Sequence, residues 1–160
     1  MKQKSLARWL KSIIIGLGIC GVITFYIILP ILGQTIDRMY QGAFHNTYLF
    51  WLFFIWIASL PCYAVLALGW KIASNIGNDR SFSIQNAKLV KAISVLAAAD
   101  TVFFFLGNII SLLLNMNHPS IVLGSLIIIL IGAAFSVAAA VLSHLILKAQ
   151  VLQEQSDWTI

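Results

Sequence analysis

Four long apolar runs, separated by short stretches that hold nearly all of the charge, dominate this sequence of 160 residues. Hydrophobic residues make up 61% of the chain and charged residues only 9%, whereas a soluble domain is about half apolar and about a quarter charged. A helix needs about 20 apolar residues to cross a bilayer, so this chain has room for four such helices and short loops. The pattern excludes a water-soluble globule and predicts one small integral membrane domain.

The four runs predict the organisation of the whole chain. The expected spans are residues 12–33, 48–70, 92–114 and 120–147, with a polar loop at 71–91 and a polar tail at 148–160. Pro61 falls inside the second span and predicts a kink, because it has no N–H to donate to the carbonyl of Ile57. The expected fold class is all-α, an integral membrane four-helix bundle.

Ser83 in the polar loop has the sequence context of a helix N-cap. Its hydroxyl is expected to accept a hydrogen bond from the backbone amide of Gln85 or Asn86, and so to start the helix that enters the membrane as the third span. Ser83 therefore marks where the loop ends.

The net charge of +5 is distributed unevenly. Nine of the ten basic residues precede the first run, lie between the second and third, or follow the fourth, which leaves only Arg38 for the other side of a four-span arrangement. Lys and Arg are retained in the cytoplasm during insertion, so both termini are predicted to be cytoplasmic. Basic flanks also attract the anionic headgroups of the lipid bilayer, which explains them without direct nucleic-acid binding.

The third predicted span holds a carboxylate near its middle, at Asp100, where an ionised group is costly. Asn108 lies on the same helical face. In one interpretation Asp100 binds a proton, cation or amine, and Asn108 and a hydroxyl from Thr24 or Ser136 complete an intramembrane polar site. In the other, Asp100 hydrogen-bonds across helices and only stabilises the bundle.

The fourth predicted span carries mostly small residues at four-residue spacing, which suits close helix packing. They are Gly124, Gly132, Ser136, Ala140 and, at the end, His144. His144 is placed near the cytoplasmic interface, where it is a candidate to sense pH or to meet Asp157 or a lipid phosphate. The alternative is that this face serves packing alone.

The loop and tail are predicted to share one side of the membrane and to form a partner-binding surface. Its candidate residues are Phe82, Asn86, Lys88, Lys91, Glu154, Asp157 and Trp158. An exposed Phe and Trp among mixed charges are suited to anchor a partner helix. Equally, Trp158 is of the kind that dips into the membrane interface.

Residues 78–89 and the ending at 154–160 resemble matching parts of the YoaS-like family, a bacterial family of unknown function. Its members have a similar length, four spans, a Phe-Ser-x-Glu-Asn-like start to the third helix and an acidic tail. Gln85 stands here where a Glu is usual, and Trp158 where a Leu is usual. The resemblance implies a multi-pass protein of the bacterial cytoplasmic membrane with no assigned enzyme activity. It also implies that the gene of this protein lies beside the gene of a very small helix-turn-helix regulator, as is often found in the family.

No catalytic motif supports an enzyme, since the chain has no H-E-x-x-H, G-x-S-x-G or glycine-rich phosphate loop. Neither a cofactor nor a metal site is expected, because both cysteines, Cys20 and Cys62, fall inside predicted spans. The predicted function is regulatory: a membrane protein that recruits or releases a small helix-turn-helix protein. The alternative is a small transporter, channel or ligand-binding protein that uses Asp100 and Asn108 and assembles as a homo-oligomer; a purely structural or immunity-type role is a third possibility.

Overall fold

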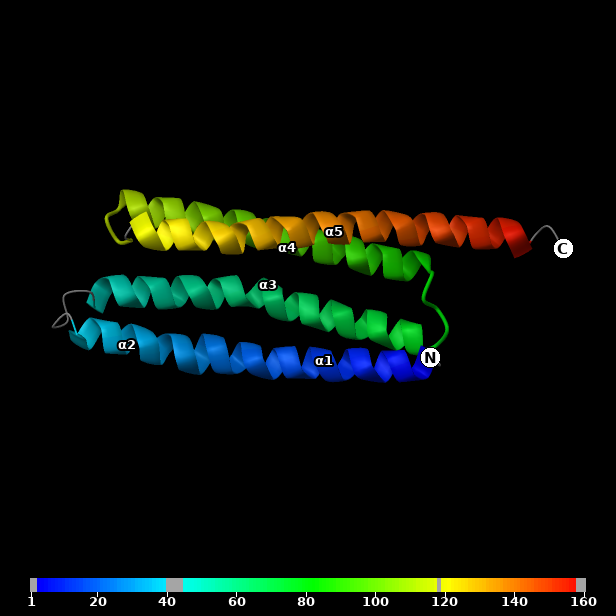
Figure 1. Ribbon diagram of the computed structural model, residues 1–160, viewed down its shortest axis with the longest axis horizontal. Helices are drawn as coiled ribbons and strands as arrows, with labels where there is room; N and C mark the ends of the chain where they lie inside the picture. Colours follow the sequence, from blue (N-terminus) through cyan, green and yellow to red (C-terminus); the bar gives the residue numbers. More distant parts are fainter. Residues whose placement is uncertain (1–2, 40–44, 118, 158–160) are drawn as a thin grey trace.

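The computed structural model describes residues 3–39, 45–117 and 119–157, which are helical along nearly their whole length and contain no strand. Figure 1 shows the long helices running side by side. The elements in chain order are α1 (Gln3–Ile23), the π-helical turn η1 (Thr24–Ile28), α2 (Leu29–Met39), α3 (His45–Gly77), α4 (Ile84–Leu113) and α5 (Pro119–Asp157). The predicted all-α fold class is confirmed.

Four helical stretches are long and apolar enough to cross a membrane. They are Gln3–Met39, Thr47–Gly77, Ile84–Leu113 and Ile121–Gln153. Most of the expected polar loop at 71–91 is helical, and only residues 78–83 separate α3 from α4. Likewise α5 continues through most of the expected tail. These added turns are rich in Lys, Ala, Gln and Leu, which favour a helix whether or not it is in a membrane.

The first span is one continuous helical stretch with a widened turn, η1, just before Pro30. Pro30 has no N–H, and a local π-helical adjustment is one way in which a membrane helix accommodates this loss. Side chains of α3 bind the carbonyls around the turn. The indole N–H of Trp56 donates to the Phe25 carbonyl at 3.2 Å, and the Tyr48 hydroxyl donates to the Pro30 carbonyl at 3.3 Å.

The second span continues through Pro61 without a break. Figure 1 shows α3 changing direction near its middle, in agreement with the kink predicted there. The physical reason is that Pro61 has no N–H to donate to the Ile57 carbonyl, so the helix can open and bend at this turn.

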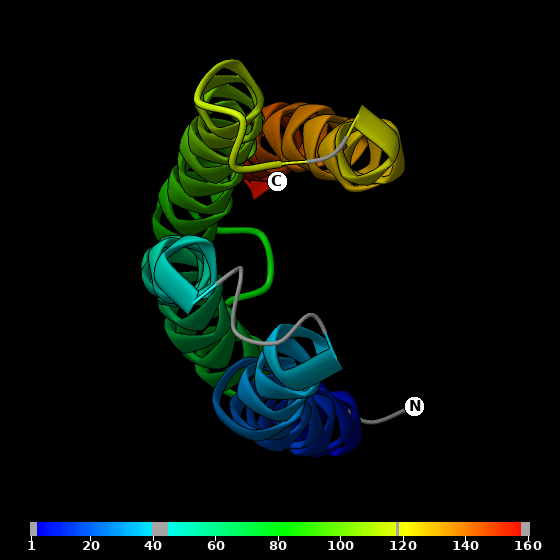
Figure 2. The ribbon, with the colours of Figure 1, turned by 90° about the vertical axis from the view of Figure 1, so that its left-hand side faces the viewer.

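The four helices form an open curved layer rather than a closed ring around one core. The backbone of α1 lies against α3, α3 against α4, and α4 against α5, and no backbone contact joins α5 to α1 or α3 within the described ranges. Figure 2 shows the resulting arc, seen along the helices, with its two ends apart. The four predicted helices are therefore present, in an open arrangement.

The small buried core lies where the middle helices meet. Val90 and Ile93 of α4 and Ala139 of α5 are buried together, and α3 side chains pack against them. Many large apolar side chains point outward instead, for example Leu130 at 68% and Ile127 at 63% exposure. Such an apolar exterior is suited to a surrounding bilayer.

The connections between helices are short and well capped. α3 and α4 both end in a Schellman motif, with Asp79 at φ 57° and Asn115 at φ 54° in the left-handed conformation that this motif requires. The Arg80 amide donates to the Asn75 carbonyl at 3.0 Å, and the Met116 amide to the Ser111 carbonyl at 2.8 Å. Figure 1 shows that the start of α1, the 78–83 loop and the end of α5 lie at one end of the molecule.

Candidate functional site

Asp100 lies on α4 where this helix meets α3. The Cys62 thiol donates to Oδ2 of Asp100 at 3.8 Å, while Oδ1 is buried and has no hydrogen-bond partner. The sequence did not predict that Cys62 lies beside the carboxylate. No local pattern could have done so, because the two residues are 38 positions apart and meet only through the register of α3 against α4.

Asn108 is fully buried, but it lies away from Asp100. Its amide nitrogen donates to the Phe104 carbonyl at 2.8 Å, and its oxygen accepts from the Asn117 amide at 3.3 Å. Eight residues along a helix correspond to about 12 Å. Asn108 therefore lies in the last turns of α4, where it bonds Asn117 of the following turn, and the structure separates it from Asp100.

The two hydroxyls that were alternatives for completing the intramembrane site, Thr24 and Ser136, also lie elsewhere. Thr24 is exposed in η1, whose backbone neighbours are α1, α2 and α3, and not α4. Ser136 donates to the Ser94 carbonyl at 2.9 Å, and Ser94 donates to the Ser136 carbonyl at 2.8 Å. Within the described residues of one chain, Asp100 thus has a cysteine as its neighbour, and neither hydroxyl reaches it.

His144 is exposed and does not lie on the contact face of α5. Its neighbour Ser143 is buried and donates to the Ala87 carbonyl of α4 at 2.7 Å. The expected four-residue register drifts, because four residues turn a helix by about 40° more than one revolution. His144 also lies too far from Asp157 for the contact suggested by the sequence, because thirteen residues of continuous helix, about 20 Å, separate the two.

Asn86, predicted to bind a partner, is 1% exposed and fastens the loop instead. Its oxygen accepts from the Asn75 amide at 2.7 Å, and its amide donates to the carbonyls of Arg80 at 3.0 Å and Ser81 at 3.1 Å. The predicted cap is confirmed, since Ser83 accepts from the Asn86 backbone amide at 3.2 Å. The first turn of α4 faces α3, which is why a polar residue there is buried.

The first helix holds the same loop from the other side. With its amide nitrogen turned toward α3, Gln3 has three acceptors within hydrogen-bond distance of its two N–H groups: the Ser81 hydroxyl at 3.1 Å, the Ile76 carbonyl at 3.0 Å and the Asp79 carboxylate at 3.1 Å. Three helices therefore hold the short loop. We call residues 75–86, with Gln3, the loop clamp.

Only part of the predicted partner surface is exposed at this end. Phe82 is 58% exposed on the loop clamp, and Lys88 and Lys91 are exposed on α4. The side chains of Glu154 and Asp157, and the whole of Trp158, lie outside the described residues. The structure thus describes the loop half of the surface.

Comparison with known proteins places the chain in a family. Residues 2–160 match the family described as "Protein of unknown function (DUF2975)". The chain belongs to this family. It is also similar to the protein named "Uncharacterized membrane protein YoaS" of Bacillus subtilis (strain 168), with 23% identity over 150 residues, 92% of each chain. No solved structure matches.

These matches bear out the resemblance seen in the sequence and, with the four apolar helices, support a multi-pass membrane protein. In this DUF2975 chain, the segment at 78–89 that carries the resemblance coincides with much of the loop clamp. Its Ser83 and Asn86 have structural roles there, as a helix cap and a tether. No group of three or more His, Cys, Asp or Glu residues that would suit a metal occurs in the described ranges.

Proposed function

We propose that this protein is a non-enzymatic regulator of the bacterial cytoplasmic membrane that recruits and releases a small cytoplasmic helix-turn-helix protein. The observation that carries the proposal is the position of Phe82, whose side chain is 58% exposed on a loop fastened by hydrogen bonds from three helices. A fixed aromatic side chain loses little entropy when it enters a partner's pocket, which makes it a suitable anchor.

The charges around Phe82 suggest what kind of surface the partner presents. Arg80, Lys88 and Lys91 are exposed on the same loop and the following helix. Such a basic rim attracts an acidic surface and speeds encounter with it. The gene neighbourhood implied by the family resemblance makes a small helix-turn-helix protein the first candidate.

The test is purification of the tagged full-length protein from its native membranes in mild detergent, followed by mass spectrometry of co-eluting proteins. We expect a helix-turn-helix protein in near-equal amount with the wild type, and its loss from the variant Phe82→Ala with Trp158→Ala. Met39→Ala is the control, because Met39 is 77% exposed at the opposite end. If both variants retain the partner equally, the proposed surface is wrong.

The second candidate function, a transporter, channel or ligand-binding protein, is supported by a different observation. Asp100 has one buried carboxylate oxygen without a partner inside an apolar helix, and such groups often mark ion or proton sites. The described helices of one chain form an open arc rather than a ring around a channel, so this function requires a homo-oligomer. Asp100→Asn would abolish flux or ligand binding in proteoliposomes, whereas Asp79→Asn, a carboxylate in the loop clamp, would leave it unchanged.

A further inference from the structure

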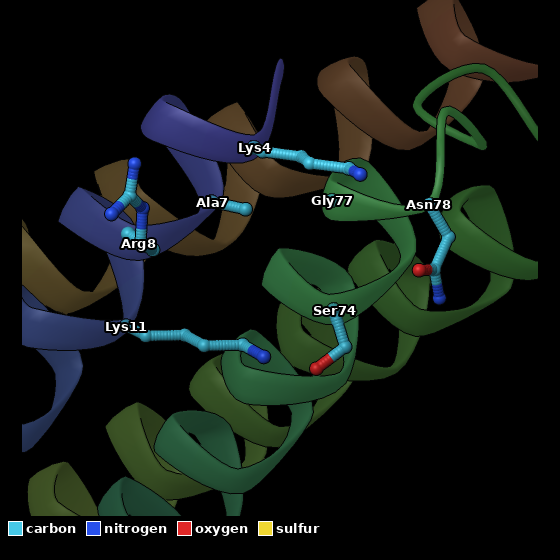
Figure 3. A pocket seen from close by; sticks show the side chains of 7 residues that line it. All are labelled: Lys4, Ala7, Arg8, Lys11, Ser74, Gly77 and Asn78. Atoms are coloured by element: carbon cyan, nitrogen blue, oxygen red, sulfur yellow. The ribbon is translucent and has the colours of Figure 1, made fainter. Parts of the chain in front are cut away.

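A basic cavity of about 420 Å³ lies between the first turns of α1 and the last turns of α3. It is lined by Lys4, Ala7, Arg8, Lys11, Ser74, Gly77 and Asn78. Figure 3 shows Lys4 and Lys11 reaching from α1 toward the end of α3, on either side of Ala7. Among the described residues, no Asp or Glu lines the cavity, so none of them neutralises its positive charge from within.

Small residues form the floor of the cavity. Ala7 is 6% exposed, and a Cβ atom placed on Gly77 would lie only 3.2 Å from the Cβ of Ala7. The two backbones are therefore close at this point. Lys4, Arg8 and Lys11 are spaced four and three residues apart, so they lie on one side of α1. Figure 3 shows the Lys4 and Lys11 side chains reaching toward α3 above this floor, and the Arg8 guanidinium at the rim of the cavity, directed away from α3.

Aromatic residues beside the cavity indicate that it lies near the level of the lipid phosphates. The Lys11 ammonium sits 5.0 Å from the centre of the Trp70 ring, and Trp70 and Trp9 are exposed at 40% and 62%, as expected for aromatic residues at a membrane interface. Ser74 and Gly77 follow Trp70 by about 6 and 10 Å along the helix. The polar headgroup layer is about 5–8 Å thick on each side of the hydrocarbon core.

We propose that this cavity binds the phosphate group of an anionic phospholipid. Its volume falls within the range of small-ligand sites, its cations attract the negative charge of a phosphodiester, and a basic pocket between membrane helices is a recognised headgroup site. The site differs from the Phe82 surface and does not depend on the proposed function.

The experiment measures lipid retained by the purified full-length protein in neutral detergent. Phosphatidylglycerol is titrated and the bound lipid counted by native mass spectrometry, with phosphatidylcholine as the neutral reference. The test variant is Lys4→Gln with Arg8→Gln and Lys11→Gln. Its matched control is Lys88→Gln with Lys91→Gln and Lys148→Gln, which removes the same charge outside the cavity.

A fourth protein, Ser74→Leu, narrows the cavity without changing its charge. We expect the cavity variant to lose about tenfold or more in affinity for phosphatidylglycerol. Ser74→Leu should also weaken this affinity, whereas the control variant should bind the lipid nearly as well as the wild type. All four are compared by circular dichroism for helix content, and detergent removes any effect of charge on insertion.

Three outcomes would overturn the assignment. Equal loss in the control variant would mean that only the overall field attracts lipid. Unchanged binding in the cavity variant would mean that the lipid sits elsewhere. If inorganic phosphate alone displaces phosphatidylglycerol and its binding shows the same dependence on Lys4, Arg8 and Lys11, the ligand is a soluble phosphate and not a lipid.

Discussion

At Gly107, a side chain of α3 packs directly against the backbone of α4. The Phe54 ring, 7% exposed, occupies the space that a Cβ at Gly107 would need, and it stacks on Phe103 and Phe104 with centroids 5.2 and 5.6 Å away. Gly107→Ala must displace this ring and should lower the free energy of unfolding by about 1–3 kcal/mol. Titration with a denaturing detergent, followed by circular dichroism, measures the change.

Gly124→Ala is the matched control for this prediction. Nothing lies within 4 Å of a Cβ at Gly124, so alanine there should be neutral or raise stability by up to about 1 kcal/mol through helix propensity. Equal destabilisation by the two variants would show that the packing of the Phe54 ring does not depend on the absence of a side chain at Gly107.

Asn86 gives the second prediction at the scale of single residues. Asn86→Ala removes three side-chain hydrogen bonds and leaves the Asn75 amide and two loop carbonyls without this partner. The expected loss is about 2–3 kcal/mol in the free energy of unfolding, measured by the same titration. Gln85→Ala, at an exposed neighbouring position, should change stability by less than about 0.5 kcal/mol, and a similar loss there would contradict the tether.

The loop clamp also shows how far sequence reasoning reaches at this scale. Ser83 was predictable as a cap because capping is local, between a hydroxyl and an amide three residues on. The burial of Asn86 was not, since its partner Asn75 lies on the preceding helix and is reached only when the short loop folds back. A polar residue near a helix start otherwise resembles a surface residue.

Between elements, two serines join α4 to α5 by reciprocal hydrogen bonds to backbone carbonyls. Ser94 and Ser136 are both buried, and each donates to the other's carbonyl. A double-mutant cycle with Ser94→Ala and Ser136→Ala should give a coupling energy of about 0.5–1.5 kcal/mol in detergent-induced unfolding. Ser125, which donates only to Val122 of its own helix, should show no coupling to Ser94, and coupling there would argue against a direct interaction.

The residues expected to form the intramembrane site lie apart because of how the helices pack against one another. Asn108 and Ser136 are buried, but the partners of buried polar residues depend on which face of each helix meets which neighbour. Nearly every face of these helices is apolar, so hydropathy does not mark the contact face. The site predicted for Asp100 therefore could not be assembled from spacing alone.

For the whole molecule, hydropathy predicted the number of helices but not the open arc. In water, an apolar face must be covered, and this requirement closes a bundle. In lipid, the tails are as apolar as the side chains, so helix contacts rest on packing and hydrogen bonds instead. The arc is held where these occur, at the Phe54 ring between α3 and α4 and at the serines between α4 and α5.

The distribution of Lys and Arg predicts how the arc is oriented in the membrane. Among the described basic residues, only Arg38 lies at the end that holds the turn between α4 and α5. Retention of Lys and Arg in the cytoplasm then places the loop clamp inside the cell and this turn outside.

A labelling experiment at the two ends of the arc tests this orientation. Phe82 and Leu114 mark the two ends and are equally accessible, at 58% and 59% exposure. In a chain with Cys20 and Cys62 replaced by alanine, a membrane-impermeant maleimide should label Leu114→Cys in intact cells, but Phe82→Cys only after permeabilisation. The opposite pattern would show that the charge asymmetry does not set the topology and would remove Phe82 from reach of any cytoplasmic partner.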